Sequence, residues 1–304
     1  MRSGAVVLAA LVLVPSAWAK GVLPDGPPSS VRVLAFAYRA HDGLRRLAYL
    51  LVPRSYDPRH DPPLPLVISP HGRGAGALAN ALRWGELPAQ GGFAVVNPQG
   101  QGRRLELYSW GAPGQIEDLA RMPRLVENAF PWVRVDARRI YAVGASMGGQ
   151  ETLLLLARHP RLLAGAAAFD APTDMALRYR DFLLLRRGRL LQRLARVEIG
   201  GPPNADPERY ELRSPSDLAR AIAFSGVPLE LWWSVRDRIV VDEAQQCGRL
   251  YREVKRLDPD APVREFVGTW AHTAELGTRL PVALERLGLL EPRNRRKQIT
   301  GVVS

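Results

Sequence analysis

The chain contains 304 residues, of which 46% are hydrophobic and 24% are charged. This length and composition suffice for one large domain with a sizeable buried core, which excludes a disordered or fibrous protein. The single cysteine, Cys247, excludes an intramolecular disulfide, so packing must supply the stability. The net charge of +12 comes almost wholly from arginine, and it either attracts an anionic surface or substrate or reflects a general arginine bias. Because no nucleic-acid-binding motif accompanies the charge, we expect no nucleic-acid partner.

The first 19 residues have the pattern of a signal peptide. Arg2 gives a positive start, residues 5–14 form an apolar run too short to span a membrane, and Ala17-Trp18-Ala19 is a small-residue cleavage site. No later stretch reaches membrane-spanning length, so we expect no membrane span. We therefore predict that the mature domain, residues 20–304, is secreted or periplasmic.

After residue 30 the chain alternates between strand-like and helix-like segments. Short apolar runs rich in β-branched residues predict eight strands, in chain order 31–38, 44–52, 66–69, 93–96, 140–143, 163–169, 229–233 and 263–267. A turn signal joins the first two as a hairpin. The alternation predicts an α/β fold with a mostly parallel eight-stranded sheet and helices on both faces.

Residues 171–226 interrupt this alternation. The segment is long and rich in leucine and arginine, with a proline- and asparagine-containing break at 201–207. We predict a helical, lid-like insertion that lies over the functional site.

A serine motif, Gly144-Ala145-Ser146-Met147-Gly148, lies between the predicted strand 140–143 and a predicted helix. A serine on such a tight corner has a strained backbone, and a side chain two residues away would collide with the turn. The hydroxyl then projects above the sheet edge beside a helix N-terminus, where amides and the helix dipole favour developing negative charge. Ser146 is therefore the predicted nucleophile.

A serine nucleophile needs a base, and the base needs a carboxylate that orients it. His272 follows the last predicted strand, at the sheet edge where open α/β folds gather their chemistry, and is the predicted base. Asp237 follows the strand 229–233 and is the predicted acid.

Other residues compete for the role of the acid. Asp242 begins a sequence, Asp242-Glu243-Ala244-Gln245, that fits the capping box of a helix. Asp170 and Asp174 follow the sixth predicted strand and are further candidates. Asp237 itself lies between two arginines and has the alternative interpretation of a surface ion pair.

The order Ser146, Asp237, His272 is the one expected of the α/β-hydrolase fold. The chain resembles α/β-hydrolase esterases of the feruloyl-esterase and polyhydroxyalkanoate-depolymerase type, and also the catalytic domain of the prolyl oligopeptidase family. Residues 66–74, with a strand and a His-Gly segment, residues 144–149 and the half from Arg213 to His272 carry this resemblance.

The resemblance implies an oxyanion hole formed by the backbone amides of Met147 and Arg73. Tyr108, Trp110 and Trp270 are candidates to line an acyl or aromatic pocket, with core or rim packing as the alternative. The insertion is longer than in compact esterases, and Trp270 replaces a small residue. No metal or organic cofactor is implied.

The expected activity is the hydrolysis of small or polymeric carboxylic esters by an exported serine hydrolase, through an acyl-enzyme. A peptidase of the prolyl oligopeptidase type is the first alternative. Against it, the chain has no room for the large N-terminal propeller of that family. An inactive hydrolase fold that serves as a binding protein is the second. Nothing in the sequence indicates an oligomeric state.

Overall fold

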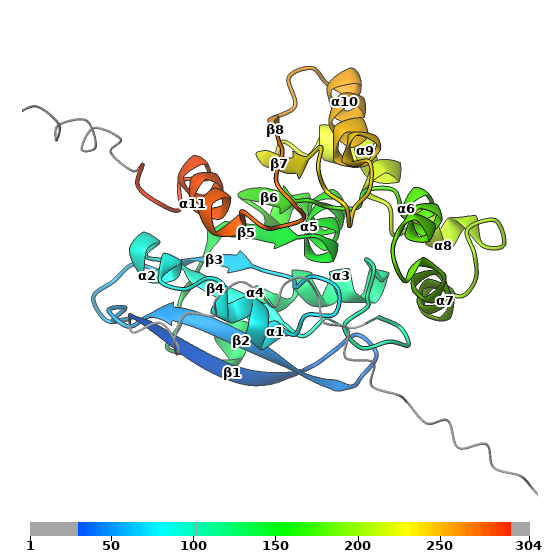
Figure 1. Ribbon diagram of the computed structural model, residues 1–304. Helices are drawn as coiled ribbons and strands as arrows, with labels where there is room; N and C mark the ends of the chain where they lie inside the picture. The colour runs from blue at the N-terminus through cyan, green and yellow to red at the C-terminus, as the bar shows by residue number, and fades with distance from the viewer. Residues whose placement is uncertain (1–29, 101, 293–304) are drawn as a thin grey trace, which may run out of the picture.

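The computed structural model describes residues 30–100 and 102–292 (Figure 1). The predicted signal peptide therefore lies outside the described residues. In the part of the chain that the structure describes, no helix is both long enough and apolar enough to cross a membrane.

The centre of the molecule is an eight-stranded sheet with the strand order β1-β2-β4-β3-β5-β6-β7-β8. The first two pairings in this order, β1 with β2 and β2 with β4, are antiparallel, and all the others are parallel. This confirms the predicted mostly parallel sheet. The strands are β1 (Val31–Arg39), β2 (Arg45–Pro53), β3 (Leu64–Ile68), β4 (Ala94–Pro98), β5 (Val135–Ala145), β6 (Gly165–Phe169), β7 (Leu229–Ser234) and β8 (Val263–Gly268).

Helices cover both faces of the sheet (Figure 1). One face packs against α1 and α11, and the other against α3, α4, α5, α9 and α10. The helices are α1 (Ala77–Leu82), α2 (Leu87–Gly91), α3 (Pro113–Ala120), α4 (Met122–Ala129), α5 (Met147–Arg158), α6 (Met175–Asp181), α7 (Gly188–Ile199), α8 (Pro207–Glu211), α9 (Ala219–Ala223), α10 (Cys247–Leu257) and α11 (Leu276–Arg286).

The two-residue period of the strands divides the core into two layers. In β3, Leu66 and Ile68 pack into the larger layer, whereas Val67 between them packs into the smaller one. Each such side chain, when fully buried, contributes about 1.5–3 kcal/mol to folding. Cys247 is fully buried in the larger layer, where its thiol donates a hydrogen bond to the carbonyl of Ala171 (3.2 Å).

The insertion between β6 and β7 consists of short helices, as predicted. Helices α6, α7 and α8 lie together beyond one end of the sheet (Figure 1) and share a third apolar cluster with Trp110 and Met147. Helix α9, also inside the predicted limits of 171–226, packs instead into the main core through Ala219, Ile222 and Ala223. The part of the insertion that stands apart from the main core is therefore α6 to α8.

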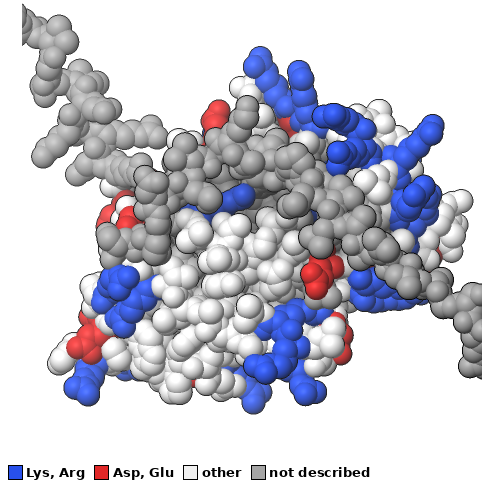
Figure 2. Space-filling model, turned by 60° about the horizontal axis from the view of Figure 1, so that its bottom comes forward, with Lys and Arg blue, Asp and Glu red and all other residues white. Residues whose placement is uncertain are grey.

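The positive charge of the chain is not gathered into one patch on the face seen in Figure 2. Lysine and arginine side chains surround an uncharged central surface there, with acidic side chains among them. This distribution favours the general arginine bias over a dedicated anionic-surface site on this face.

Candidate active site

Ser146 occupies the sharp turn between β5 and α5 with a backbone φ of 58° and ψ of −126°. The glycines on either side have the predicted steric reason. A Cβ on Gly144 would lie 2.3 Å from the carbonyl oxygen of Gly148, and a Cβ on Gly148 would lie 2.2 Å from that of Pro70. The turn is therefore pressed against the loop that begins at Pro70.

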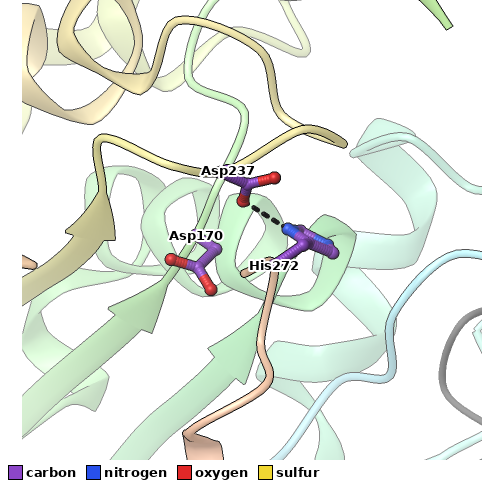
Figure 3. Close-up of side chains that lie close together, drawn as sticks. All are labelled: Asp170, Asp237 and His272. Carbon is purple, nitrogen blue, oxygen red and sulfur yellow. Dashed lines mark hydrogen bonds and ion pairs between the residues drawn. The ribbon is translucent and has the colours of Figure 1, made fainter. Parts of the chain in front are cut away.

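His272 and Asp237 form a hydrogen bond of 2.5 Å between the imidazole Nδ1 and the carboxylate Oδ2 (Figure 3). The other carboxylate oxygen of Asp237 accepts hydrogen bonds from the amides of Ile239 (2.7 Å) and Val240 (3.0 Å). Burial raises the pKa of Asp237, but the hydrogen bond and charge of His272, with the Ile239 amide, outweigh this and hold the pKa below its usual value. An ionised Asp237 keeps the proton on Nδ1, which leaves Nε2 as the basic atom.

The alternative in which Asp237 forms a surface ion pair is wrong. The Asp237 side chain is fully buried, whereas the flanking Arg236 and Arg238 are exposed. Among the rivals, Asp174 accepts a hydrogen bond from the amide of Leu177 and thereby caps the N-terminus of α6. It has a structural role already.

Asp170, at the end of β6, holds the loop that carries His272. Its carboxylate accepts hydrogen bonds from the indole Nε1 of Trp270 (3.0 Å) and from the amide of Thr273 (2.7 Å). Burial and the charge of Asp237 raise the pKa of Asp170 to about 6, against the opposing effects of His272 and Thr273. The ring of Trp270 also lies 3.7 Å from the guanidinium of Arg279. Trp270 is therefore buried and supports this loop.

Asp170, Asp237 and His272 offer ligand atoms that all lie within 4.8 Å of one another. Such a set of two carboxylates and one imidazole is able to coordinate a metal ion, although no metal-binding motif in the sequence indicates such a site. Here, however, the imidazole Nδ1 and Asp237 Oδ2 are bonded directly to each other. A metal ion would have to replace that bond, so the observed arrangement fits proton transfer better than metal binding.

The loop after β3 is braced by His71. This buried imidazole contacts the carbonyl of Gly72 through Nδ1 (2.9 Å) and accepts a hydrogen bond from the amide of Gly100 through Nε2 (2.8 Å). Burial lowers the pKa of His71, in keeping with the role of its Nε2 as a hydrogen-bond acceptor. Within the described residues no group accepts a hydrogen bond from the Arg73 amide, and Met147 is the first residue of α5, whose amide has no partner in the helix.

The predicted pocket residues Tyr108 and Trp110 lie in a loop against the serine turn. Trp110 is buried, and its amide donates a hydrogen bond to the sulfur of Met147 (3.3 Å). Tyr108 packs edge-on against Trp110, with its hydroxyl near Gly74 of the loop after β3. Trp110 is therefore packing beneath the turn, and Tyr108 is the more accessible of the two.

The predicted capping box at residues 242–245 is wrong. Asp242 has a left-handed backbone (φ 52°) and forms no cap, a short 3₁₀ turn spans Glu243–Gln245, and α10 begins only at Cys247. Glu243 is instead buried beside the acid–base pair. Burial and the charges of Asp170 and Asp237 raise its pKa well above the usual value.

A second buried acid, Glu151, joins the serine helix to the loop of Tyr108 and Trp110. It accepts a hydrogen bond from the hydroxyl of Ser109 and interacts with the side chain of Gln115. Burial raises the pKa of Glu151 to about 7, although these hydrogen bonds and the charge of Arg213 oppose the shift.

The comparisons with known proteins bear on the fold that carries this site. No protein-family model matches the chain. Over 110 residues it is 32% identical to poly(3-hydroxyalkanoate) depolymerase C of Paucimonas lemoignei, a match that covers 34% of this chain and 27% of the depolymerase. The matched region is thus about a quarter of the length of that relative.

Two solved structures resemble most of the chain. The acylaminoacyl peptidase of Pyrococcus horikoshii has a TM-score of 0.63 at 17% identity, over 84% of this chain and 41% of the peptidase. The S-formylglutathione hydrolase of Staphylococcus aureus has a TM-score of 0.63 at 14% identity, over 86% of this chain and 100% of the hydrolase. At these identities the likeness establishes the fold alone.

The chain therefore has the α/β-hydrolase fold, as the resemblance implied, and its serine turn is the one that serine hydrolases of this fold use. Its similarity to the depolymerase and to the acylaminoacyl peptidase is distant.

The close approach at Gly148 gives a first prediction. The substitution Gly148→Ala places a methyl group against Pro70 and pushes the Arg73 loop away, so we expect loss of activity and a destabilisation of about 1–3 kcal/mol. Gly277→Ala, in α11 where a methyl group meets nothing within 4 Å, is the matched control and should leave both unchanged or slightly raise stability. Activity assays and thermal unfolding compare the two variants with the wild type. A Gly148→Ala variant with wild-type activity and stability contradicts this account of the turn.

The buried Glu151 gives a pH prediction. Because its pKa rises from 4.5 in the unfolded chain to about 7, the folded state retains the proton, and stability falls as pH rises from 4.5 to 7, by up to about 3 kcal/mol. Glu151→Gln removes this penalty, so we expect the variant to be the more stable protein at pH 8 and to lose that advantage near pH 4.5. Urea denaturation at both pH values measures it, with the exposed Glu106→Gln as control. If the free energy of unfolding of Glu151→Gln depends on pH in the same way as that of the wild type, burial does not raise the pKa of Glu151 as stated.

Proposed function

We propose that the chain is a serine hydrolase that cleaves carboxylic esters, with Ser146 as nucleophile, His272 as base and Asp237 as acid. The observation that carries the proposal is the buried hydrogen bond between His272 and Asp237 at the same sheet edge as the strained serine turn. The link between the two passes through β6. The Ser146 amide donates to Phe169 (2.8 Å), and the next residue, Asp170, holds the His272 loop.

In this mechanism Ser146 attacks the ester carbonyl while His272 Nε2 takes its proton and then passes it to the leaving alcohol. Asp237 stabilises the imidazolium that forms. The amides of Met147 and Arg73 hold the oxyanion of the tetrahedral intermediate. Water then attacks the acyl-enzyme while His272 takes its proton. His272 returns this proton to Ser146 as the acid leaves, which restores the serine.

Esters rather than peptides are the proposed substrates. The similarity to a polyester depolymerase, and the full-length structural match to an S-formylglutathione hydrolase, support this choice. The likeness to an acylaminoacyl peptidase supports peptide cleavage as the second candidate. Turnover rates of nitrophenyl esters and of aminoacyl naphthylamides distinguish the two candidates. Faster turnover of the esters supports the ester hydrolase, and faster turnover of the naphthylamides supports the peptidase.

We further propose that residues 1–19 are removed on export and that the enzyme acts as a secreted or periplasmic protein, on small or polymeric esters. The pattern of charge, apolar run and small-residue cleavage site supports this. N-terminal sequencing of the mature protein from culture fluid and periplasm tests it, and an intact Met1 in the cell interior contradicts it.

Replacement of the nucleophile tests the mechanism. Ser146→Ala should lower ester turnover by about 10⁵-fold or more with little change in melting temperature, because the side chain is small and lies at the sheet edge. A fluorophosphonate probe should label the wild type and leave the variant unlabelled. An unlabelled wild type with no turnover points instead to an inactive binding protein.

Replacement of the two carboxylates separates the acid from the brace. Asp237→Asn should lower kcat by about 10⁴-fold, because the amide no longer favours the proton on Nδ1. Asp170→Asn should cost only about 10–100-fold, since an amide oxygen still accepts from Trp270 and Thr273. Steady-state kinetics of both variants measure this. A larger loss for Asp170→Asn would transfer the role of acid to Asp170.

A further inference from the structure

Helix α6 of the insertion carries a buried arginine without a hydrogen-bonding partner for one of its nitrogens. Arg178 is only 3% exposed, and within the described residues its Nη1 has no acceptor. The guanidinium lies over the ring of Phe182, 4.8 Å from the centroid. A buried cation in this state is costly unless an anion joins it.

The position of α6 turns this arginine toward the serine turn. Arg178 and Tyr179 follow Met175 by three and four residues, and these three are the buried residues of the helix, so Met175 shares one side of the helix with both. Met175 and Tyr179 belong to the apolar cluster that contains Met147, the residue after the nucleophile. Arg178 is therefore on the side of α6 that faces the candidate active site.

The charged groups around Arg178 include a second arginine. Burial and the positive charge of Arg73, from the loop after β3, lower the pKa of Arg178 to about 9, although Asp237, Asp181 and Glu243 oppose the shift. Arg73 is itself partly buried, and no carboxylate among the described residues forms an ion pair with either arginine. Arg73, from a separate element, therefore adds its positive charge to the surroundings of Arg178.

None of the acids that act on Arg178, namely Asp237, Asp181 and Glu243, forms an ion pair with it among the described residues. Asp237 is bonded to His272 and to two backbone amides. Burial and the charges of Asp170 and Asp237 raise the pKa of Glu243 well above its usual value, which disfavours its charged form. A structural role for Arg178 as the counter-ion of these acids would require hydrogen bonds to them, and its Nη1 forms none within the described residues.

We propose that Arg178 and Arg73 form a subsite for a carboxylate group of the substrate, so that the enzyme prefers esters that carry a free carboxylate. Guanidinium groups bind carboxylates in a planar, bidentate geometry that a neutral ester cannot satisfy. This inference rests on the proposed function and goes beyond it, because the catalytic residues by themselves select no substrate charge.

Paired substrates of equal size test the subsite. For the acyl side we compare 4-nitrophenyl hydrogen glutarate with the neutral 4-nitrophenyl 5-methylhexanoate, and for the alcohol side 4-acetoxybenzoate with 4-isopropylphenyl acetate. The quantity is the ratio of kcat/KM for the charged ester over its neutral partner. We expect the wild type to favour the charged ester in one of the two pairs.

In that pair, Arg178→Met should lower the ratio by about 10–100-fold, the range of one charge-assisted interaction. Arg73→Met should lower it as well, since its backbone amide remains. The ratio cancels any effect on catalysis that both esters share. Arg180→Met, on the exposed side of the same helix, is the matched control and should leave the ratio unchanged.

Two results overturn the subsite. One is a wild type that prefers the charged ester in neither pair. The other is an Arg178→Met variant that keeps the wild-type ratio and whose thermal unfolding curve shows that it is folded. The neutral esters and fluorophosphonate labelling report separately on the proposed function. Should no ester be turned over, titration calorimetry of the Ser146→Ala protein with monomethyl glutarate decides: binding that Arg178→Met weakens supports the subsite, and no binding rejects it.

Discussion

The hydrogen bond between His272 and Asp237 sets the electrostatics of the whole sheet edge. Three buried carboxyl groups, those of Asp170, Asp237 and Glu243, act on one another electrostatically, and nearby like charges disfavour ionisation in a buried place. His272 and two amides bind Asp237 and hold its pKa below the usual value, whereas burial raises the pKa of Glu243 well above its usual value and that of Asp170 to about 6. The carboxylate that bonds to the imidazole is thus the one of the three whose pKa is lowered.

Burial gives these interactions their strength. The imidazole of His272 is 5% exposed and Ser146 is 9% exposed, so little water screens the charges of the site. The insertion contributes to this enclosure through its cluster with Met147. The same helices also carry the buried Arg178, so that in the proposed subsite the enclosure of the site and the choice of substrate depend on one segment.

The sheet, the serine turn and the acid–base pair could be predicted from the sequence because each depends on local chemistry: apolar runs, two flanking glycines, and strand ends that must share an edge. The brace formed by Asp170, the buried Glu243 and the buried Arg178 could not, because their roles arise from packing between distant segments. Glu243 even lay in a pattern typical of a helix cap. Only its burial beside Asp237 distinguishes the two interpretations.

The buried thiol of Cys247 has a consequence for the chemistry of the chain in an oxidising medium. Cysteine reacts as the thiolate, and burial raises the pKa of this thiol well above its usual value while the fold closes over it. The native molecule therefore neither cross-links to a second copy nor consumes oxidant through this residue. Its thiol becomes reactive only when α10 separates from the end of β6, which makes Cys247 an internal reporter of unfolding.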